Sequence, residues 1–143
     1  MENTKQLVLT YYGVIYSKKN SKRIVTNRRT GRPMIVSSEK AKEMENDMVK
    51  QFSDQYHNTS PIDKPFAAIY GKPLKVKISI WQKDKTRRDL DNQATSILDA
   101  LVAGGVIVDD SVDIVQELIV KMMGTDKKHP RARIEIRGVK DAE

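Results

Sequence analysis

The 143-residue chain contains no cysteine and only a small share of aromatic side chains. The absence of cysteine excludes disulfide bonds, zinc–thiolate sites and thiol chemistry. Aromatic residues make up 6% of the chain, so we expect a mainly aliphatic core, and a base-stacking platform for single strands is disfavoured. No apolar run approaches the ~18 residues needed to span a bilayer, and no signal peptide is recognisable. The sequence therefore predicts a cytoplasmic protein without a membrane segment.

Positive charge, in contrast, is in excess. The chain has 26 Lys and Arg against 19 Asp and Glu, which gives a net charge of +7 and a pI near 9.6. Such an excess favours polyanionic partners, because each phosphate neutralised by Lys or Arg releases condensed counterions. Many small basic proteins bind nothing specific, so the distribution of charge has to decide between the two interpretations.

Hydrophobic periodicity predicts a strand and a helix in the N-terminal half. Residues 7–16 are rich in β-branched and aromatic side chains, which predicts a strand. Ser37 or Ser38 is a candidate N-cap, and the apolar residues behind it recur at helical spacing, which predicts a helix over 38–57. The stretch 58–73 holds three prolines and is predicted to be a connection.

The C-terminal half predicts one further helix between strands. Its expected elements are a strand of alternating apolar and polar residues at 74–81, a helix at about 92–103 ended by Gly104-Gly105, and strands at 113–123 and 131–138. The predicted fold class is therefore α+β. Residues 1–143 are expected to form a single compact domain with two main helices packed on a mixed β-sheet, in the order β-(loop)-α-β-α-β-β.

Basic residues are concentrated in three runs. The segment 18–33 holds seven basic residues and no acidic one, and is predicted to be a loop or a short exposed hairpin. A second run lies directly before Asp89, and a third lies on the predicted terminal strands. Charge runs are often only solvated surface, yet three runs around one acidic centre predict a positive rim that holds a DNA backbone. The candidate DNA-binding residues are Lys18, Lys19, Lys22, Arg23, Arg28, Arg29, Lys85, Arg87, Arg88 and Lys121.

The acidic centre consists of two pairs that flank the predicted second helix. Asp89 and Asp91 precede this helix, and residues i and i+2 of an extended segment point to the same side, so both carboxylates can aim at one point. Asp109 and Asp110 follow it, and the glycine pair is expected to let the chain return towards Asp91. Converging carboxylates suit Mg²⁺ or Mn²⁺, which prefer oxygen ligands and stabilise charge on a cleaving phosphodiester.

Each acidic residue taken singly has a plain structural explanation. Asp91 is a candidate N-cap, and Asp109-Asp110 is a candidate turn. Asp84 and Asp113 are close enough in sequence to be rival ligands. The metal-site hypothesis therefore rests on the combination of these residues inside a basic rim.

The stretch RRDLDNQATSILDALVAGGVIVDD resembles the RusA-type Holliday junction resolvases that are common in phages and prophages. The motifs that carry the resemblance are DLDN at 89–92, LDAL at 98–101 and the DD pair at 109–110. Agreement is strongest over 87–122, the predicted catalytic segment, and extends in order over nearly the whole chain. The combined motifs are far more specific than any one of them.

The resemblance implies a homodimeric, Mg²⁺-dependent endodeoxyribonuclease that binds four-way junctions and nicks two strands symmetrically. It implies that Asp89, Asp91 and Asp110 are the catalytic, metal-binding carboxylates, with Asp109 as a further candidate ligand. Mn²⁺ is expected to substitute for Mg²⁺, and neither an organic cofactor nor a membrane is implied.

Thr95 departs from the family pattern, which usually has a lysine four residues after the second DLDN aspartate. A threonine hydroxyl cannot replace the charge of a lysine beside the scissile phosphate. Lys121 and Lys85 are the nearest candidates to compensate. The alternative is a non-catalytic or weakly catalytic protein that binds branched DNA. A third hypothesis is a basic interaction module whose acidic residues only cap and turn.

Overall fold

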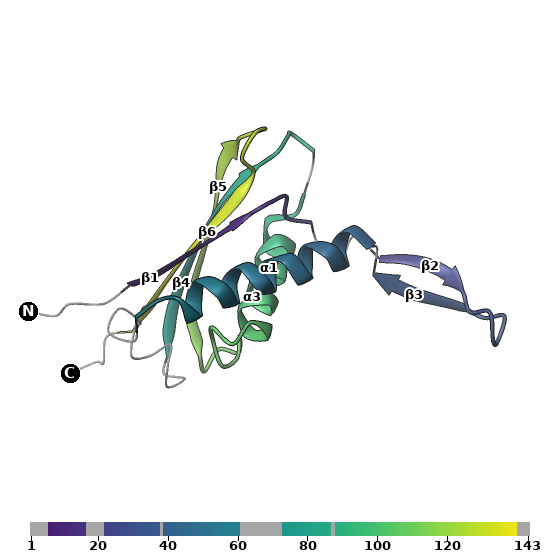
Figure 1. Cartoon of the computed structure of the whole chain (residues 1–143), viewed down its shortest axis with the longest axis horizontal. Coiled ribbons are helices and arrows are strands. Elements are labelled where there is room, and N and C mark those ends of the chain that lie inside the picture. Colours follow the sequence, from purple (N-terminus) through teal and green to yellow (C-terminus); the bar gives the residue numbers. More distant parts are fainter. Residues whose placement is uncertain (1–5, 17–21, 38, 61–72, 87, 140–143) are drawn as a thin grey trace, which may run out of the picture.

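The described part of the chain combines a four-stranded mixed sheet, a separate two-stranded hairpin and two helices (Figure 1). The computed structural model describes residues 6–16, 22–37, 39–60, 73–86 and 88–139, with the backbone alone at 22–25 and 34–37. In chain order the elements are β1 (Gln6–Tyr12), β2 (Lys22–Thr26), β3 (Pro33–Ser37), α1 (Glu39–His57), β4 (Leu74–Gln82), α3 (Leu90–Ala103), β5 (Val115–Thr125) and β6 (Arg131–Gly138). The α+β class expected from the sequence is confirmed.

The sheet has the strand order β1-β6-β4-β5. β6 pairs antiparallel with both β1 and β4, whereas β4 and β5 are parallel. Parallel neighbours need a crossover connection, and α3 provides it. The chain therefore runs forward along β4, back along α3 and forward again along β5. As a result, α3 begins near the end of β4 and finishes near the start of β5.

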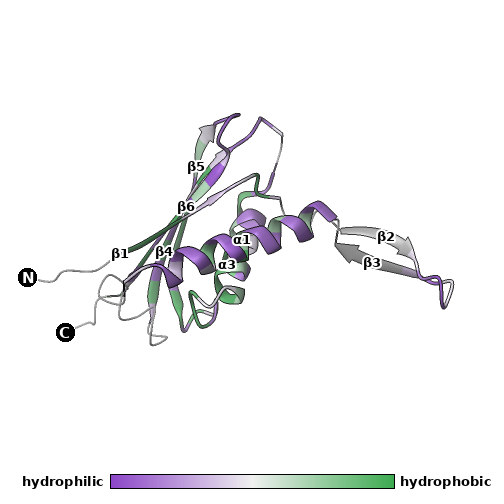
Figure 2. Ribbon diagram, in the orientation of Figure 1, coloured by the Kyte–Doolittle hydropathy of each residue, from purple (hydrophilic) through white to green (hydrophobic). Residues whose placement is uncertain are grey.

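Both helices cover one face of the sheet. The inward residues of β4, such as Val76 and Ile78, are at most 1% exposed and belong to one core with Phe52 of α1 and Leu101 of α3. The buried residues of α1 recur at helical spacing, which confirms the predicted apolar stripe. Figure 2 shows that the remainder of α1 is mainly hydrophilic, whereas α3 carries more hydrophobic residues.

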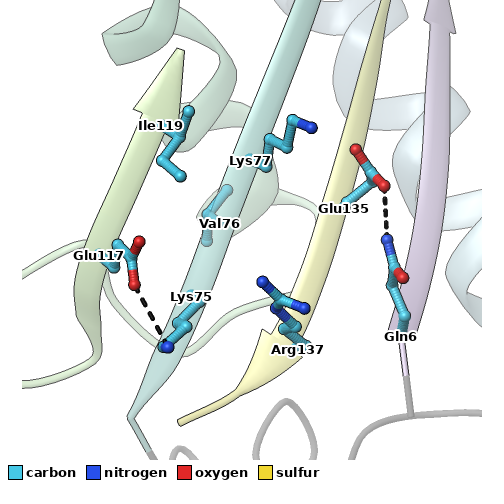
Figure 3. A pocket seen from close by; sticks show the side chains of 8 residues that line it. All are labelled: Gln6, Lys75, Val76, Lys77, Glu117, Ile119, Glu135 and Arg137. Atoms are coloured by element: carbon cyan, nitrogen blue, oxygen red, sulfur yellow. Dashed lines mark hydrogen bonds and ion pairs between the residues drawn. The ribbon is translucent and has the colours of Figure 1, made fainter. Parts of the chain in front are cut away.

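The opposite face of the sheet is open and charged. Lys75 forms an ion pair with Glu117 at 3.4 Å, and Gln6 donates a 2.6 Å hydrogen bond to Glu135 (Figure 3). Near the far end of β4, the Arg131 guanidinium stacks over the ring of Trp81 at 4.1 Å from its centroid. This alternation of a buried and a wet face was expected from the period of two in β4.

The edge of the sheet at β1 is closed by α1. The side chain of Gln55 accepts a hydrogen bond from the Thr10 N–H at 2.8 Å and donates one to the Thr10 carbonyl at 2.6 Å. The side chain of Gln51 makes the same two bonds with the backbone of Tyr12, at 2.9 and 3.2 Å. Two glutamines thus take the place of a neighbouring strand.

Several boundaries differ from the sequence prediction. The first strand ends at Tyr12, and the basic segment 18–33 contains most of the β2–β3 hairpin. α3 begins at Leu90, two residues earlier than expected. Most of the connection predicted at 58–73 lies outside the described residues. No helix in the described ranges is both long and apolar enough to cross a bilayer.

Candidate functional site

Asp89 occupies the N-cap position of α3 without capping the helix. Its backbone is extended, with φ −80° and ψ 122°, and its carboxylate accepts no hydrogen bond from the N–H groups of the first turn. The residue is exposed, and Oδ2 accepts a 3.3 Å hydrogen bond from Nδ2 of Asn92. An aspartate at this position normally caps the helix. The Asp89 carboxylate makes no such bond and is exposed, so it remains accessible to a ligand.

Asp91 lies in the first turn of α3, so the N-cap explanation for this residue is wrong. It is exposed, and its carboxylate makes no hydrogen bond or ion pair within the described part of the chain. The positive end of the helix dipole favours a negative charge here. The early start of α3 also means that Asp89 and Asp91 do not share one extended segment. They meet instead at the N-terminal end of one helix.

Thr95 lies one turn further along α3, on the same side of the helix as Asp91. Its hydroxyl donates a 3.0 Å hydrogen bond to the Asp91 carbonyl, and the residue is exposed. The position therefore borders Asp91, but the side chain there carries no charge.

Two buried polar residues that the sequence analysis missed anchor the beginning of α3. Gln93 is 1% exposed, and its Nε2 donates a 3.0 Å hydrogen bond to the Ile15 carbonyl. Ser96 donates a 3.3 Å hydrogen bond to the Tyr16 carbonyl. These bonds fix the chain after β1 against the helix end that carries Asp89. Polar residues on the inward face of a helix were the signal that could have revealed them.

The second acidic pair lies beyond the other end of α3. Gly105 has φ +75°, and the Val106 N–H donates a 2.9 Å hydrogen bond to the Leu101 carbonyl, so the helix ends at the glycine pair as predicted. Asp109 and Asp110 are both exposed, and Oδ1 of Asp109 accepts a 2.9 Å hydrogen bond from the Asp110 N–H. The carboxylate of Asp110 makes no hydrogen bond or ion pair with any described residue.

The expected return of the chain towards Asp91 is not found. α3 has 14 residues, so its ends lie about 21 Å apart at a rise of ~1.5 Å per residue. After Asp110 the chain soon enters β5 at Val115, which pairs with Leu74, the first residue of β4. Asp89, in contrast, follows the last residue of β4. The parallel crossover therefore places the two acidic pairs at opposite ends.

Within one chain, the described residues contain no group of three His, Asp or Glu side chains that could hold a metal ion. Asp89 and Asp91 offer two exposed carboxylates at one end of α3, and Asp110 offers a third near the other end. Carboxylate oxygens are suitable ligands for a hard cation such as Mg²⁺. The carboxylate ligands are thus of the chemical type that Mg²⁺ prefers, but the described residues of a single chain do not bring three of them together.

Arg88 and Asp84 brace the loop between β4 and α3. The Arg88 guanidinium contacts Asp84 at 3.0 Å and Gln82 at 2.9 Å, and its side chain is 13% exposed. Hydrogen bonds from the side chain and backbone N–H of Thr86, and then from Arg88, lower the pKa of Asp84 to about 2. Asp84 is therefore paired and is a poor rival ligand. Arg88, which was predicted to bind DNA, is largely enclosed by the loop.

The remaining predicted DNA contacts are dispersed. Lys85 is exposed and lines a hollow at the end of the sheet with Lys83 and Lys127. Lys121 pairs in register with Ser79 on the open face, which is the side of the sheet away from α3. Lys85 is therefore better placed than Lys121 to act near Asp91.

Residues of the N-terminal basic segment are described in part. Arg28 and Arg29 are exposed at the tip of the β2–β3 hairpin, where Oδ1 of Asn27 accepts a 2.9 Å hydrogen bond from the Arg29 N–H. This turn orders the backbone that presents both cations. Lys22 and Arg23 lie on β2, whose backbone alone is described there. Lys18 and Lys19, like Arg87 in the later loop, lie outside the described residues.

Exposed carboxylates bordered by exposed cations are the arrangement expected of a protein that cuts a phosphodiester backbone. The family model described as endodeoxyribonuclease RusA matches residues 16–137, well over half of the chain. The chain belongs to this family and is an endodeoxyribonuclease of the Holliday junction resolvase type, so the resemblance seen in the DLDN and DD motifs is confirmed. Enzymes of this family act on branched DNA and generally depend on a divalent metal. No curated protein matches the chain.

Proposed function

We propose that this protein resolves four-way DNA junctions as a Mg²⁺-dependent homodimer that makes paired, symmetric nicks. The proposal depends above all on Asp89, whose exposed carboxylate occupies the capping position of α3 without capping the helix, two residues before Asp91. Membership of the RusA family supports the junction substrate. The choice of Mg²⁺, the symmetric nicking and the dimer are part of the proposal.

DNA is positioned by exposed cations on two elements. Lys85 is exposed in the loop that leads from β4 to α3, and Arg28 with Arg29 forms the tip of the hairpin. Such groups bind phosphates without reading sequence, so affinity should fall steeply as salt rises. Binding through phosphates suits an enzyme that selects DNA by its branched shape and not by its base sequence.

Asp89, Asp91 and Asp110 are the residues proposed to hold the cation. When bound, Mg²⁺ stabilises the charge on the phosphate under attack and lowers the pKa of a coordinated water. Without a cation, the exposed carboxylates of Asp89 and Asp91 repel the DNA backbone. We therefore expect both the cleavage step and the close approach of the phosphate to require the metal.

The decisive substitution is Asp91→Asn, which keeps the size of the side chain and removes its charge. We expect nicking of a labelled four-way junction to fall by about 100-fold or more, because a metal-binding charge is lost. Junction binding, measured by gel shift, should persist. Asp54→Asn is the matched control, since Asp54 is an exposed aspartate on α1. Unchanged cutting by the Asp91 variant would remove this residue from the mechanism.

Thr95 favours a second candidate function, a branched-DNA binding protein with little or no cleavage. Its hydroxyl is bonded to the Asp91 carbonyl and brings no positive charge to the site. Wild-type protein that binds the junction but fails to nick it with Mg²⁺ would support this candidate.

Two substitutions identify the compensating cation. If the missing lysine limits the rate, Thr95→Lys should raise cleavage. If Lys85 compensates, Lys85→Ala should lower it, and Lys83→Ala serves as the neighbouring control. A module whose acidic residues only cap and turn would show no preference for a junction over a linear duplex.

A further inference from the structure

The open face of the sheet carries more cations than carboxylates. Alternation along β4, β5 and β6 puts six cationic side chains of these described strands on this face, and two acidic ones, Glu117 and Glu135. We call the six cations the basic strip: Lys75, Lys77, Lys121, Arg131, Arg133 and Arg137. Figure 3 looks onto this face, with the helices behind the sheet. An excess of one sign on an uncovered surface favours an anionic partner.

The two carboxylates of this face are already paired. Glu117 lies 3.4 Å from Lys75, and Glu135 accepts a 2.6 Å hydrogen bond from Gln6. Three members of the basic strip, in contrast, make no ion pair or hydrogen bond with any described residue. They come from three strands: Lys77 from β4, Lys121 from β5 and Arg137 from β6. These three cations are free to neutralise an anion from outside the chain.

Two of the three free cations line one shallow hollow. Lys77 and Arg137 border it from neighbouring strands, together with the paired Lys75 (Figure 3). Both side chains donate charged hydrogen bonds, which are shorter and stronger than neutral ones when the acceptor is a phosphate oxygen. The hollow therefore suits a phosphate group better than a neutral ligand.

The basic strip runs along the length of the sheet. Outward residues of a strand follow each other at about 6.7 Å, so Lys75 and Trp81 are ~20 Å apart. Every outward level of β4 from Lys75 to Trp81 has at least one cation of the strip on β4, β5 or β6. Beyond Trp81, positive charge continues into the hollow lined by Lys83, Lys85 and Lys127. A length of ~20 Å corresponds to about six base pairs of duplex DNA at 3.4 Å each.

The aromatic residues of this face do not form a platform for unpaired bases. The Arg131 guanidinium covers the ring of Trp81 at 4.1 Å from its centroid, and Tyr12 lies on the edge strand β1. Proteins that hold single strands without sequence preference stack successive bases on free rings. The strip is therefore suited to the phosphate backbone of a duplex. This agrees with a family that acts on branched DNA.

The basic strip and the acidic residues of α3 lie on different sides of the sheet. Asp89 and Asp91 are at the N-terminal end of α3, in the helix layer, whereas the strip is on the open face. One straight duplex cannot follow both surfaces, but the diverging arms of a branched molecule can. DNA that occupies both gains a second, intramolecular attachment, which raises its affinity without a new kind of contact.

We propose that the open face binds one duplex arm of a branched DNA through the basic strip, while another arm lies at Asp89 and Asp91. This second attachment makes the protein prefer branched DNA to linear duplex. The location of the arm that is cut rests on the proposed function, whereas the contact between the strip and a duplex arm does not.

The strip is tested by removing its three free charges together, in the variant Lys77→Gln, Lys121→Gln, Arg137→Gln. We expect the Kd for a four-way junction to rise by about tenfold or more, and the slope of log K against log salt to fall by about two to three, since each phosphate contact contributes ~0.9. The Kd for a linear duplex should rise by at most about twofold, because the surface near α3 still binds it.

Binding is measured by fluorescence anisotropy with Ca²⁺ in place of Mg²⁺, and the DNA is checked for nicks afterwards. The matched control removes three exposed lysines of α1: Lys40→Gln, Lys42→Gln, Lys50→Gln. This control has the same net charge as the strip variant, and its preference for the junction should equal that of the wild type. Equal losses in both variants, or equal losses for junction and linear duplex in the strip variant, would overturn the proposal.

A single-stranded oligonucleotide distinguishes the two forms of DNA. The strip variant should bind it about as well as the charge-matched α1 variant does. If the strip variant instead loses more affinity for the single strand than for the junction, the open face holds an unpaired strand and the duplex arm is excluded.

A cross-link locates the arm without removing any charge. Val8→Cys introduces the one thiol of the chain at a position that is 42% exposed and in register with Glu135, the neighbour of Lys77. A photoactivated reagent on this thiol should attach to paired bases of one arm, about four base pairs or more from the branch, because Lys77 lies ~13 Å before Trp81. Lys50→Cys on α1 is the control, and an equal yield from both would overturn the proposal.

Neither measurement depends on cutting. A wild type that binds the junction without nicking it would refute the proposed function and leave the binding and cross-linking results valid. An active enzyme whose preference for the junction survives in the strip variant would overturn the role of the open face and leave the proposed function standing.

Discussion

The two edges of one sheet, β1 and β5, are finished in opposite ways. At β1, Gln51 and Gln55 of α1 hydrogen-bond to the backbone as a further strand would. At β5, the described residues leave the outer backbone groups without partners, and apolar side chains stay exposed on both faces. An edge closed from within needs no second molecule, whereas an apolar open edge does. The two edges of the sheet are therefore not equivalent in their demand for a partner.

The largest expected effect comes from placing a charge at the centre of the open edge. Ile119→Asp places a carboxylate on the exposed apolar edge, and we expect the proposed homodimer to weaken by about 100-fold or more, since close like charges across an interface cost several kcal/mol. Sedimentation equilibrium measures the change. Val8→Asp, at the closed edge, should leave association as it is. Equal effects at Val8 and Ile119 would mean that the two edges do not differ.

The closed edge is tested by removing one of its glutamines. Gln55→Leu leaves the N–H and C=O of Thr10 without their partner, and a part-buried unpaired polar group costs about 1–3 kcal/mol. We expect the free energy of unfolding, measured in urea, to fall by roughly 2 kcal/mol. Lys50→Leu, at an exposed position of the same helix, should change it by less than ~0.5 kcal/mol. A similar loss in both variants would show that Gln55 does not close the edge.

The smallest effect is expected at the exposed Asp84, in the loop beside the end of β4. The pKa of Asp84 is lowered to about 2 from the usual 3.8, so its ionised form stabilises the fold above pH 4, and this contribution disappears as the pH falls towards 2. Thermal unfolding of wild type and Asp84→Asn should therefore differ by a small constant amount at pH 5–7 and converge at low pH. A difference that grows on acidification would contradict the assignment.

The regular elements could be predicted from the sequence where one face of each is buried. The alternation in β4 and the apolar stripe of α1 were clear because the core covers one side of each. The same rule loses its force at β5, whose residues are exposed on both faces. Because neither face of β5 is buried in the single chain, its sequence does not alternate between apolar and polar residues.

The residues of the candidate site could be predicted, but their arrangement could not. The spacing of Asp89, Asp91 and Asp110 follows from the chain. The direction of β5 relative to β4 does not, because it depends on pairing between distant segments. A helix followed by two glycines is compatible with an antiparallel return or with a parallel crossover. The glutamines of α1 were likewise ambiguous, since a polar residue on a helix normally faces water.

The length of α3 has a further consequence for how the enzyme is controlled. Since its 14 residues separate the two acidic pairs, an isolated chain of the proposed dimer holds an incomplete cutting site. Below the dissociation constant, a tenfold dilution would then lower the cutting rate by about 100-fold, because the population of dimers follows the square of the chain concentration.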